Sequence, residues 1–317
     1  MSAFAWPSFF SGDFHVGEQG QESGRFCRTV LVVRAGMLFM DGEQVLAAVA
    51  YLMGMDPDGL TCDEPGHLGG HACLPVSGSV DMEALVKMLT EQYAGPFSQP
   101  DGLSALRLGE QVGWTHTWVW DARAVALGHA SDGRPVMAVT ERNPPNPAEL
   151  PAEMSWVERL VAITAVTVPL VPAPDWASVE SRLGSALPSD YKLLVERFGC
   201  DGLFDEFFHV FSPEELIWHT EVFSDGGFVP EGEHPASFPA SDGVIPWSDN
   251  EHEERFFWIT EGPDPDCWPV YALDSLNEGS RFECTATEFL FRQMTDLDLP
   301  LTTTADFRGH WFMRTIG

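Results

Sequence analysis

The sequence predicts an α+β protein of two domains, each a small, mostly antiparallel sheet packed with helices. With 317 residues, the chain is long for one domain and comfortable for two. Apolar residues recur at helical spacing in both halves, and short apolar runs separated by turns predict strands between residues 103 and 140. Three prolines within 167–174 predict a semi-rigid linker between the halves.

The first half is expected to begin with a loosely ordered segment, residues 1–25, which is rich in glycine, serine and acids. One or two strands over 27–40 then lead into a helix over 41–55. Asp41 is expected to cap that helix, because its carboxylate can accept from the free N–H groups of the first turn. A loop rich in glycine and proline follows over 56–78.

A second helix is expected to start after Asp81, which caps it, and to run through Tyr93. Four strands come next, over 103–108, 114–120, 123–130 and 135–140. A helix through Leu160 closes this domain, which spans residues 26–166 and shows no family resemblance.

The second domain is expected over 175–317 and is expected to fold by itself. Asp175 caps its first helix, and Pro188 suits the first position of a second helix, where a missing N–H costs nothing. Gly199 and Gly202 are expected to stop that helix, since glycine tolerates the left-handed conformation. The apolar stripes of this helix pair are Trp176, Val179, Leu183 and Leu187, followed by Tyr191, Leu194, Val195 and Phe198.

The helix pair resembles the opening of a SUKH-superfamily domain. In that family a tryptophan begins the first helix and a leucine-glycine pair follows. A Leu-Pro-x-Asp-Tyr turn then leads into the second helix, which ends in an aromatic-glycine pair. The corresponding residues are Trp176, Leu183-Gly184, Leu187-Pro188-x-Asp190-Tyr191 and Phe198-Gly199.

Later motifs follow in the order that the family shows, so that the resemblance covers about residues 174–295. Ile245-Pro246-Trp247 and Asp249-Asn250 resemble its Pro-Trp segment and Asn-Gly turn, although Glu251 replaces the glycine. The remaining matches are a core strand at Phe257-Trp258, a strand entry at Pro265 to Val270, and the final helix start at Phe282 and Thr285 to Leu290.

The resemblance implies a mostly antiparallel sheet against helices, and protein binding rather than catalysis. The superfamily groups many bacterial toxin-immunity proteins with a yeast cell-wall synthesis regulator. The resemblance therefore implies that this chain neutralises a cognate toxin by covering it. An adaptor or regulator that meets no toxin is the alternative.

Net charge points to the same kind of partner. The chain carries −31, and residues 171–317 hold 28 acids against 8 bases. Such a charge argues against nucleic acid and anionic membrane as partners. It favours a basic protein as the partner, because the negative electrostatic field would accelerate the approach of such a protein. Nucleases are among the toxins of this kind. General solubility is the competing interpretation.

The strongest candidates for partner binding are acids between residues 242 and 266, with Trp247 and Trp268 as weaker aromatic candidates. Those acids are Asp242, Asp249, Glu251, Glu253, Glu254, Glu261, Asp264 and Asp266. No nucleophile, base and oxyanion donor come together in the sequence, and His209, set among phenylalanines, is interpreted as a core residue. We therefore expect no enzyme activity.

One cluster has metal-ligand chemistry. Cys62, His67, His71 and Cys73 offer four ligands of the kind that zinc prefers. Their spacing matches no common zinc motif, and the single residue between His71 and Cys73 is tight, so we expect no metal and no cofactor. A zinc-dependent enzyme in the first half is the least favoured alternative.

Localisation is predicted from absences in the sequence. No run of 18 apolar residues and no basic, apolar leader occur, and six cysteines are scattered. Only two lysines occur in a chain rich in arginine, alanine, glycine and proline, which is typical of a high-GC bacterial genome. These features predict a cytoplasmic bacterial protein with reduced thiols.

Overall fold

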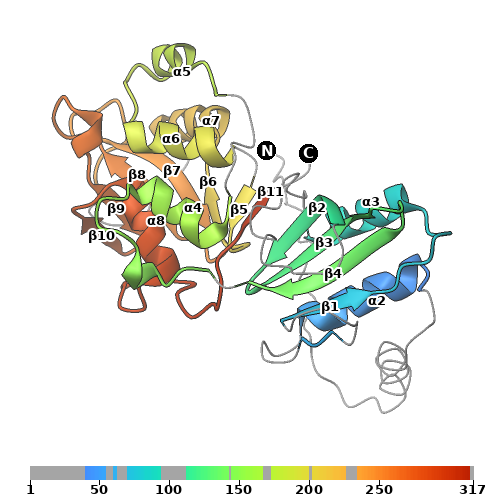
Figure 1. Cartoon of the computed structure of the whole chain (residues 1–317). Helices are drawn as coiled ribbons and strands as arrows, with labels where there is room; N and C mark the ends of the chain where they lie inside the picture. The colour runs from blue at the N-terminus through green and yellow to red at the C-terminus, as the bar shows by residue number, and fades with distance from the viewer. Residues whose placement is uncertain are drawn as a thin grey trace. The chain divides into compact units, whose positions relative to one another are not determined.

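A computed structural model describes most of the chain after residue 39 (Figure 1). The described residues are 40–54, 60–62, 70–93, 112–142, 144–166, 173–199, 202–225 and 234–314. Within them, seven α-helices accompany two antiparallel sheets of four and seven strands. This confirms the α+β class. The strands expected over 27–40 and 103–108 fall outside the described residues, apart from Met40.

The smaller sheet has the order β1-β4-β3-β2, with every neighbouring pair antiparallel. Its strands are β1 (His71–Leu74), β2 (Val112–Trp120), β3 (Arg123–Ala130) and β4 (Pro135–Glu141). The last three confirm strands expected from the sequence. β1 corrects the expectation of a loop over 56–78. Its four residues are too few to show a period, and pairing with β4 decides their conformation.

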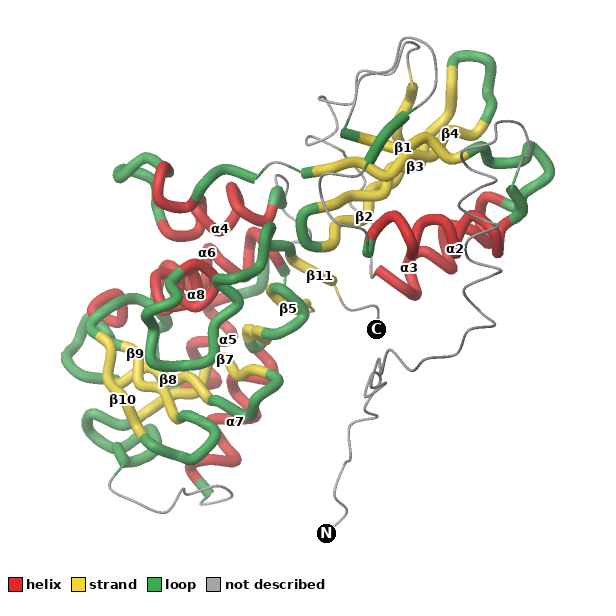
Figure 2. Tube along the Cα trace, turned by 90° about the horizontal axis from the view of Figure 1, so that it is seen from below, coloured by secondary structure: helices red, strands yellow, loops and turns green. Residues whose placement is uncertain are grey.

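Two capped helices pack on one face of this sheet (Figure 2). They are α2 (Gly42–Met53) and α3 (Met82–Tyr93). Asp41 accepts a hydrogen bond from the Gln44 N–H at 2.9 Å, and the Gln44 side chain returns one to the Asp41 N–H at 3.2 Å. Asp81 accepts from the second and third N–H groups of its helix. Both predicted caps are therefore confirmed.

The larger sheet has the order β10-β9-β8-β7-β6-β5-β11, again antiparallel throughout. Its strands are β5 (Gly202–Phe204), β6 (Phe208–Val210), β7 (Val244–Asn250), β8 (Arg255–Ile259), β9 (Val270–Leu273), β10 (Gly279–Phe282) and β11 (Phe312–Arg314). β11, the last strand among the described residues, thus pairs with β5, at the opposite end of the sheet from β10.

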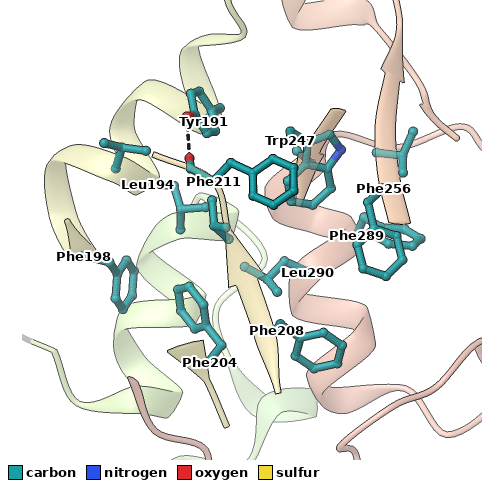
Figure 3. Packing of buried hydrophobic residues seen from close by; sticks show 14 of the residues in the cluster. Tyr191, Leu194, Phe198, Phe204, Phe208, Phe211, Trp247, Phe256, Phe289 and Leu290 are labelled. Atoms are coloured by element: carbon teal, nitrogen blue, oxygen red, sulfur yellow. Dashed lines mark hydrogen bonds between the residues drawn. The ribbon is translucent and has the colours of Figure 1, made fainter. Parts of the chain in front are cut away.

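Five helices accompany this sheet: α4 (Trp156–Thr164), α5 (Trp176–Leu183), α6 (Ser189–Phe198), α7 (Pro213–Ser224) and α8 (Ala286–Thr295). Side chains of α6 and α8 close a large aromatic core against β5 to β8 (Figure 3). The Tyr191 hydroxyl donates to the Phe211 carbonyl at 2.7 Å, which satisfies the polar atom that this buried ring brings into the core. All four predicted apolar positions of α6 are buried.

The helix pair differs from its prediction in where the first helix ends. Asp175 caps α5 through the Ser178 N–H, as expected. Gly184 ends α5 with φ of 80°, a left-handed conformation that favours glycine. Pro188 precedes α6 as its cap residue instead of opening it. Gly199 ends α6, as expected, whereas Gly202 already belongs to β5.

Helix α4 was expected to close the first domain, but its side chains lie elsewhere. Val157, Leu160 and Ile163 are buried in the same core as α6 and α8. Residues 39–317 form one compact unit. The domain boundary stays a prediction, because residues 167–172 of the expected linker lie outside the described residues.

A buried arginine also forms hydrogen bonds to residues from both halves of the sequence. The Arg142 guanidinium donates to the carbonyls of Asp121, Ile163 and His310. Burial lowers the pKa of Arg142 to about 10, against the raising effect of the Asp121 and Asp205 charges. The side chain therefore stays a cation at neutral pH. None of the helices in the described residues is long and apolar enough to cross a membrane.

Candidate partner-binding site

The eight predicted acids lie in or just before β7, in the β7–β8 turn and in the segment after β8, but only some are available to a partner. Asp242, Glu251 and Glu253 are exposed, and Asp249 is half-buried. Glu254, by contrast, is buried. Its carboxylate accepts from the Thr302 N–H and hydroxyl at 3.1 and 3.0 Å and from the Asn250 amide at 2.6 Å. These internal bonds leave Glu254 no role at a surface.

The last three acids of the set are partly used inside the protein. Asp266 accepts from the Ser189 N–H at 2.6 Å and so caps α6, which Pro188 cannot do. Asp264 caps the short turn that follows it. Glu261 forms a two-pronged ion pair with Arg281, at 2.6 and 2.8 Å. Their first role is structural.

The two tryptophans proposed as weak anchors belong to the core. Trp247 has no exposed surface and Trp268 only 6 %. Trp247 stacks on Trp258 with 5.8 Å between ring centroids and lies against α8 (Figure 3). The expectation that these rings reach a partner is therefore wrong. Trp247 lies in the same core as Ile245, two residues earlier in β7, and the β7–β8 register shifts at this point, between Pro246 and Ser248.

The turn between β7 and β8 forms without the glycine of the family pattern. The Asn250 side-chain oxygen accepts from the N–H groups of His252 and Glu254, at 3.0 and 3.1 Å. Glu253 takes the left-handed conformation, with φ of 64°. Because Asn250 organises the turn, a side chain at Glu251 is tolerated. Glu251 and Glu253 extend from its tip.

His209 on β6 lies between two carboxylates and is not the core residue expected from its phenylalanine neighbours. Its Nδ1 atom is 3.4 Å from Asp249, and its Nε2 atom is 3.6 Å from Glu215 of α7. Burial lowers the pKa of His209, but the two carboxylates outweigh burial and raise it to about 9. The imidazole is thus a cation at neutral pH, which makes it unsuited to act as a general base.

Helix α7 carries the surface feature that the sequence analysis missed. Ser212 and Glu215 form a capping box at its start, and Pro213 occupies its first turn. Its exposed side chains are Glu214, Trp218, Glu221 and Ser224, and the exposed Asp225 follows as its C-cap residue. Glu214, Trp218, Glu221 and Asp225 are spaced at three and four residues, which places them on one face. The capping box was the available signal for this helix.

Trp218 is an exposed aromatic ring that its neighbours hold in place. Its side chain is 58 % exposed. The ring meets His219 edge-on at 4.7 Å, and His219 stacks on buried Phe211 at 4.1 Å. Arg182 pairs with Glu214 at 2.7 Å beside it. A large, supported ring surrounded by carboxylates suits a partner that offers both apolar and basic groups.

We define the acidic face as the exposed side of α7 and the β7–β8 turn, which His209 joins through Glu215 and Asp249. Its members are Glu214, Trp218, Glu221, Asp225, Asp249, Glu251 and Glu253. Carboxylates are crowded here. Burial and the Glu251 charge raise the pKa of nearby Glu206 to about 7. Such crowding favours the approach of a cationic group.

A second set of side chains converges in the smaller sheet. Cys62, His71 and Cys73 place one ligand atom each within 4.8 Å of the others. His67, the fourth residue of the predicted cluster, lies outside the described residues.

Comparisons with known proteins give no match: no family model, no curated protein and no solved structure matches the chain. Membership of the SUKH superfamily therefore stays a prediction from the order of the motifs.

Proposed function

We propose that this chain is a cytoplasmic immunity protein, not an enzyme, that binds a cognate basic toxin and covers its working surface. The observation that carries the proposal is the exposed Trp218 between the carboxylates of Glu214 and Glu221 on α7. Tryptophan, with tyrosine and arginine, is enriched where the binding energy of interfaces concentrates. The order of SUKH-like motifs gives the functional class, and the acidic face gives the surface.

Charge makes nucleases the first class of toxin to test. A nuclease binds a polyanion, so its substrate path is lined by arginine and lysine. Residues 171–317 carry 28 acids against 8 bases, and such a surface can occupy that path in place of phosphates. Occlusion needs only binding, which agrees with the cationic His209.

Co-expression tests the proposal. Each protein encoded beside this gene is produced in a bacterial host with and without the chain, and growth is followed. Rescue from a toxic neighbour, with a complex that co-elutes at one-to-one stoichiometry, supports immunity. Rescue should weaken with Trp218→Ala, fail when the acids of the acidic face are neutralised as well, and persist with Leu297→Ala, a control at another exposed apolar side chain.

Two outcomes would contradict the proposal. Rescue that survives Trp218→Ala together with neutralisation of the acids of the acidic face would remove this surface from the mechanism. A chain that rescues from no toxic neighbour, yet binds a non-toxic one through the same surface, would favour the adaptor alternative.

A further inference from the structure

We propose that Cys62, His71 and Cys73 bind one zinc ion at the edge of the smaller sheet. The proposal revises the expectation from sequence spacing, and it is independent of the proposed immunity function. Two sulfur atoms and one imidazole nitrogen all lie within 4.8 Å of one another. In a tetrahedral site with Zn–S of about 2.3 Å and Zn–N of about 2.0 Å, ligand atoms are about 3.5–3.8 Å apart. Side-chain rotations that move the ligand atoms by about an ångström would bring them to these tetrahedral distances.

Strand geometry explains why the tight spacing of His71 and Cys73 suits a metal. Residues two apart in a strand point to the same side of the sheet. Both belong to β1, whose register with β4 sets His71 opposite Thr140 and Cys73 opposite Ala138. A separation that is awkward in a loop therefore brings two ligands to one side of a strand.

The third ligand comes from a different part of the chain. Cys62 follows Leu60, which is buried at 4 % exposure and fixes this segment against the core. His71 is buried at 2 % exposure, and the two cysteines are half-buried. The three groups thus converge from two segments into a sheltered position. Shelter of this kind strengthens the attraction between thiolate and cation.

Ligand chemistry selects the metal. Thiolate and imidazole ligands favour zinc over magnesium or calcium, which prefer oxygen. Three protein ligands leave one tetrahedral position for a water molecule or a further side chain. We assign the ion a structural role. β1 is an edge strand of only four residues, and a metal bound by His71, Cys73 and Cys62 would tie it to the preceding segment.

A disulfide between Cys62 and Cys73 is the competing use of the same atoms. The two interpretations differ in redox state, because zinc requires thiolates and a disulfide consumes them. They also differ in the part of His71, which a disulfide does not need.

The first experiment is elemental analysis of the full chain, purified under reducing conditions from cells grown with added zinc. We expect one zinc per chain. Cys62→Ser, Cys73→Ser and His71→Gln should each reduce zinc to background, whereas Cys267→Ser, at an exposed thiol far along the sequence, should not. Zinc retained in all three ligand variants would overturn the proposal, since the ion would then be adventitious or bound elsewhere.

A second measurement covers variants that fail to fold. Cobalt(II) is titrated into the metal-stripped wild-type chain and followed by its visible spectrum. A tetrahedral site with two thiolates gives strong d–d bands and sulfur-to-cobalt charge transfer, which zinc then displaces. Absence of those bands, with both thiols still reactive towards a thiol reagent, would overturn the proposal. If Cys62 and Cys73 are already oxidised after purification under reducing conditions, the zinc proposal is also overturned, and the disulfide is favoured instead.

Discussion

The Nδ1 atom of His209 lies 3.4 Å from the carboxylate of Asp249, on the neighbouring strand of the larger sheet. Because Nε2 of the same ring faces Glu215, one imidazole holds α7 to the strands that it crosses. The acidic face of the proposed partner-binding surface is built on this contact. Its stability should therefore depend on the protonation of His209.

The first prediction is a stability maximum in mildly acidic solution. The pKa of His209 is raised from 6.5 to about 9, so its contribution is complete below pH 6.5 and is lost as pH rises through about 9. Against the raising effect of burial, hydrogen bonds from His209 and Ser212 lower the pKa of Glu215 from 4.5 to about 2. Its contribution is present above pH 4.5 and lost as pH falls through about 2.

Urea unfolding from pH 3 to pH 10 checks this prediction. Between pH 4.5 and 6.5 the free energy of unfolding lost in His209→Gln should be largest, and it should shrink at pH 9.5. A difference between wild type and His209→Gln that is the same at pH 6 and pH 9.5 would contradict it.

The second prediction concerns Trp218. Its replacement by alanine should weaken toxin binding by roughly thirtyfold, corresponding to about 2 kcal/mol for a residue at the centre of an interface. Stability should change by less than about 0.5 kcal/mol, because the ring is exposed. Calorimetric titration of the toxin and thermal unfolding measure the two effects. In the control, Leu297→Ala should leave both toxin binding and thermal stability close to those of the wild type.

The third prediction separates steering from general solubility. Replacing Glu214, Glu221, Glu251 and Glu253 by glutamine should slow association with the toxin by about tenfold at low salt. High salt should remove most of the difference, since exposed charges are screened over about 8 Å at physiological ionic strength. The matched control changes four other exposed acids to amides: Glu153, Glu278, Asp298 and Asp306. If association slows equally in both variants, the acidic face does not steer the toxin, and the negative charge of the chain serves general solubility.

The fourth prediction distinguishes two adjacent glutamates. Glu254→Ala removes a buried carboxylate and leaves Asn250 and Thr302 without their acceptor, which should cost about 1–3 kcal/mol. Glu253→Ala, one residue earlier and exposed, should stay within about 0.5 kcal/mol of wild type. Urea unfolding of both variants at pH 7 checks the contrast. Equal losses would show that Glu254 does not hold the turn.

The fifth prediction concerns the second domain as expected from sequence. Residues 171–317 lack α4, whose Val157, Leu160 and Ile163 fill the core between α6 and α8. At about 1.5–3 kcal/mol for each buried aliphatic side chain, the loss is about 5–9 kcal/mol, comparable with the whole stability of many proteins. Residues 151–317 should therefore unfold cooperatively at a higher temperature than 171–317. Equal midpoints by calorimetry would count against this role of α4.

The local elements were the part that sequence could predict. Asp41, Asp81 and Asp175 each cap the helix that follows them, because a cap depends only on the next three residues. The apolar stripe of α6 is buried as expected, since its period of 3.6 fixes which side chains share a face.

Features that depend on distant partners escaped prediction. β1 is defined by β4, some sixty residues later in the chain, and the convergence of Cys62 with His71 and Cys73 follows from that pairing. The buried Glu254 cannot be told from exposed Glu253 by sequence, because only the Thr302 segment distinguishes them. Trp247 was expected to reach a partner and is buried, and exposed Trp218 was not singled out, because sheet packing, not the number of nearby acids, decides which ring is covered.

The place of α4 and β11 in one core also sets the order of events during synthesis. α4 leaves the ribosome roughly 120 residues before α8, and β11 is made after α8. At about 5–20 residues per second, the apolar side of α4 waits roughly 6–24 seconds for α8, whereas its other neighbour, α6, is made much sooner. Until β11 has been made, the larger sheet lacks the strand that pairs with β5, so the apolar core around α4 is completed only after synthesis of both α8 and β11.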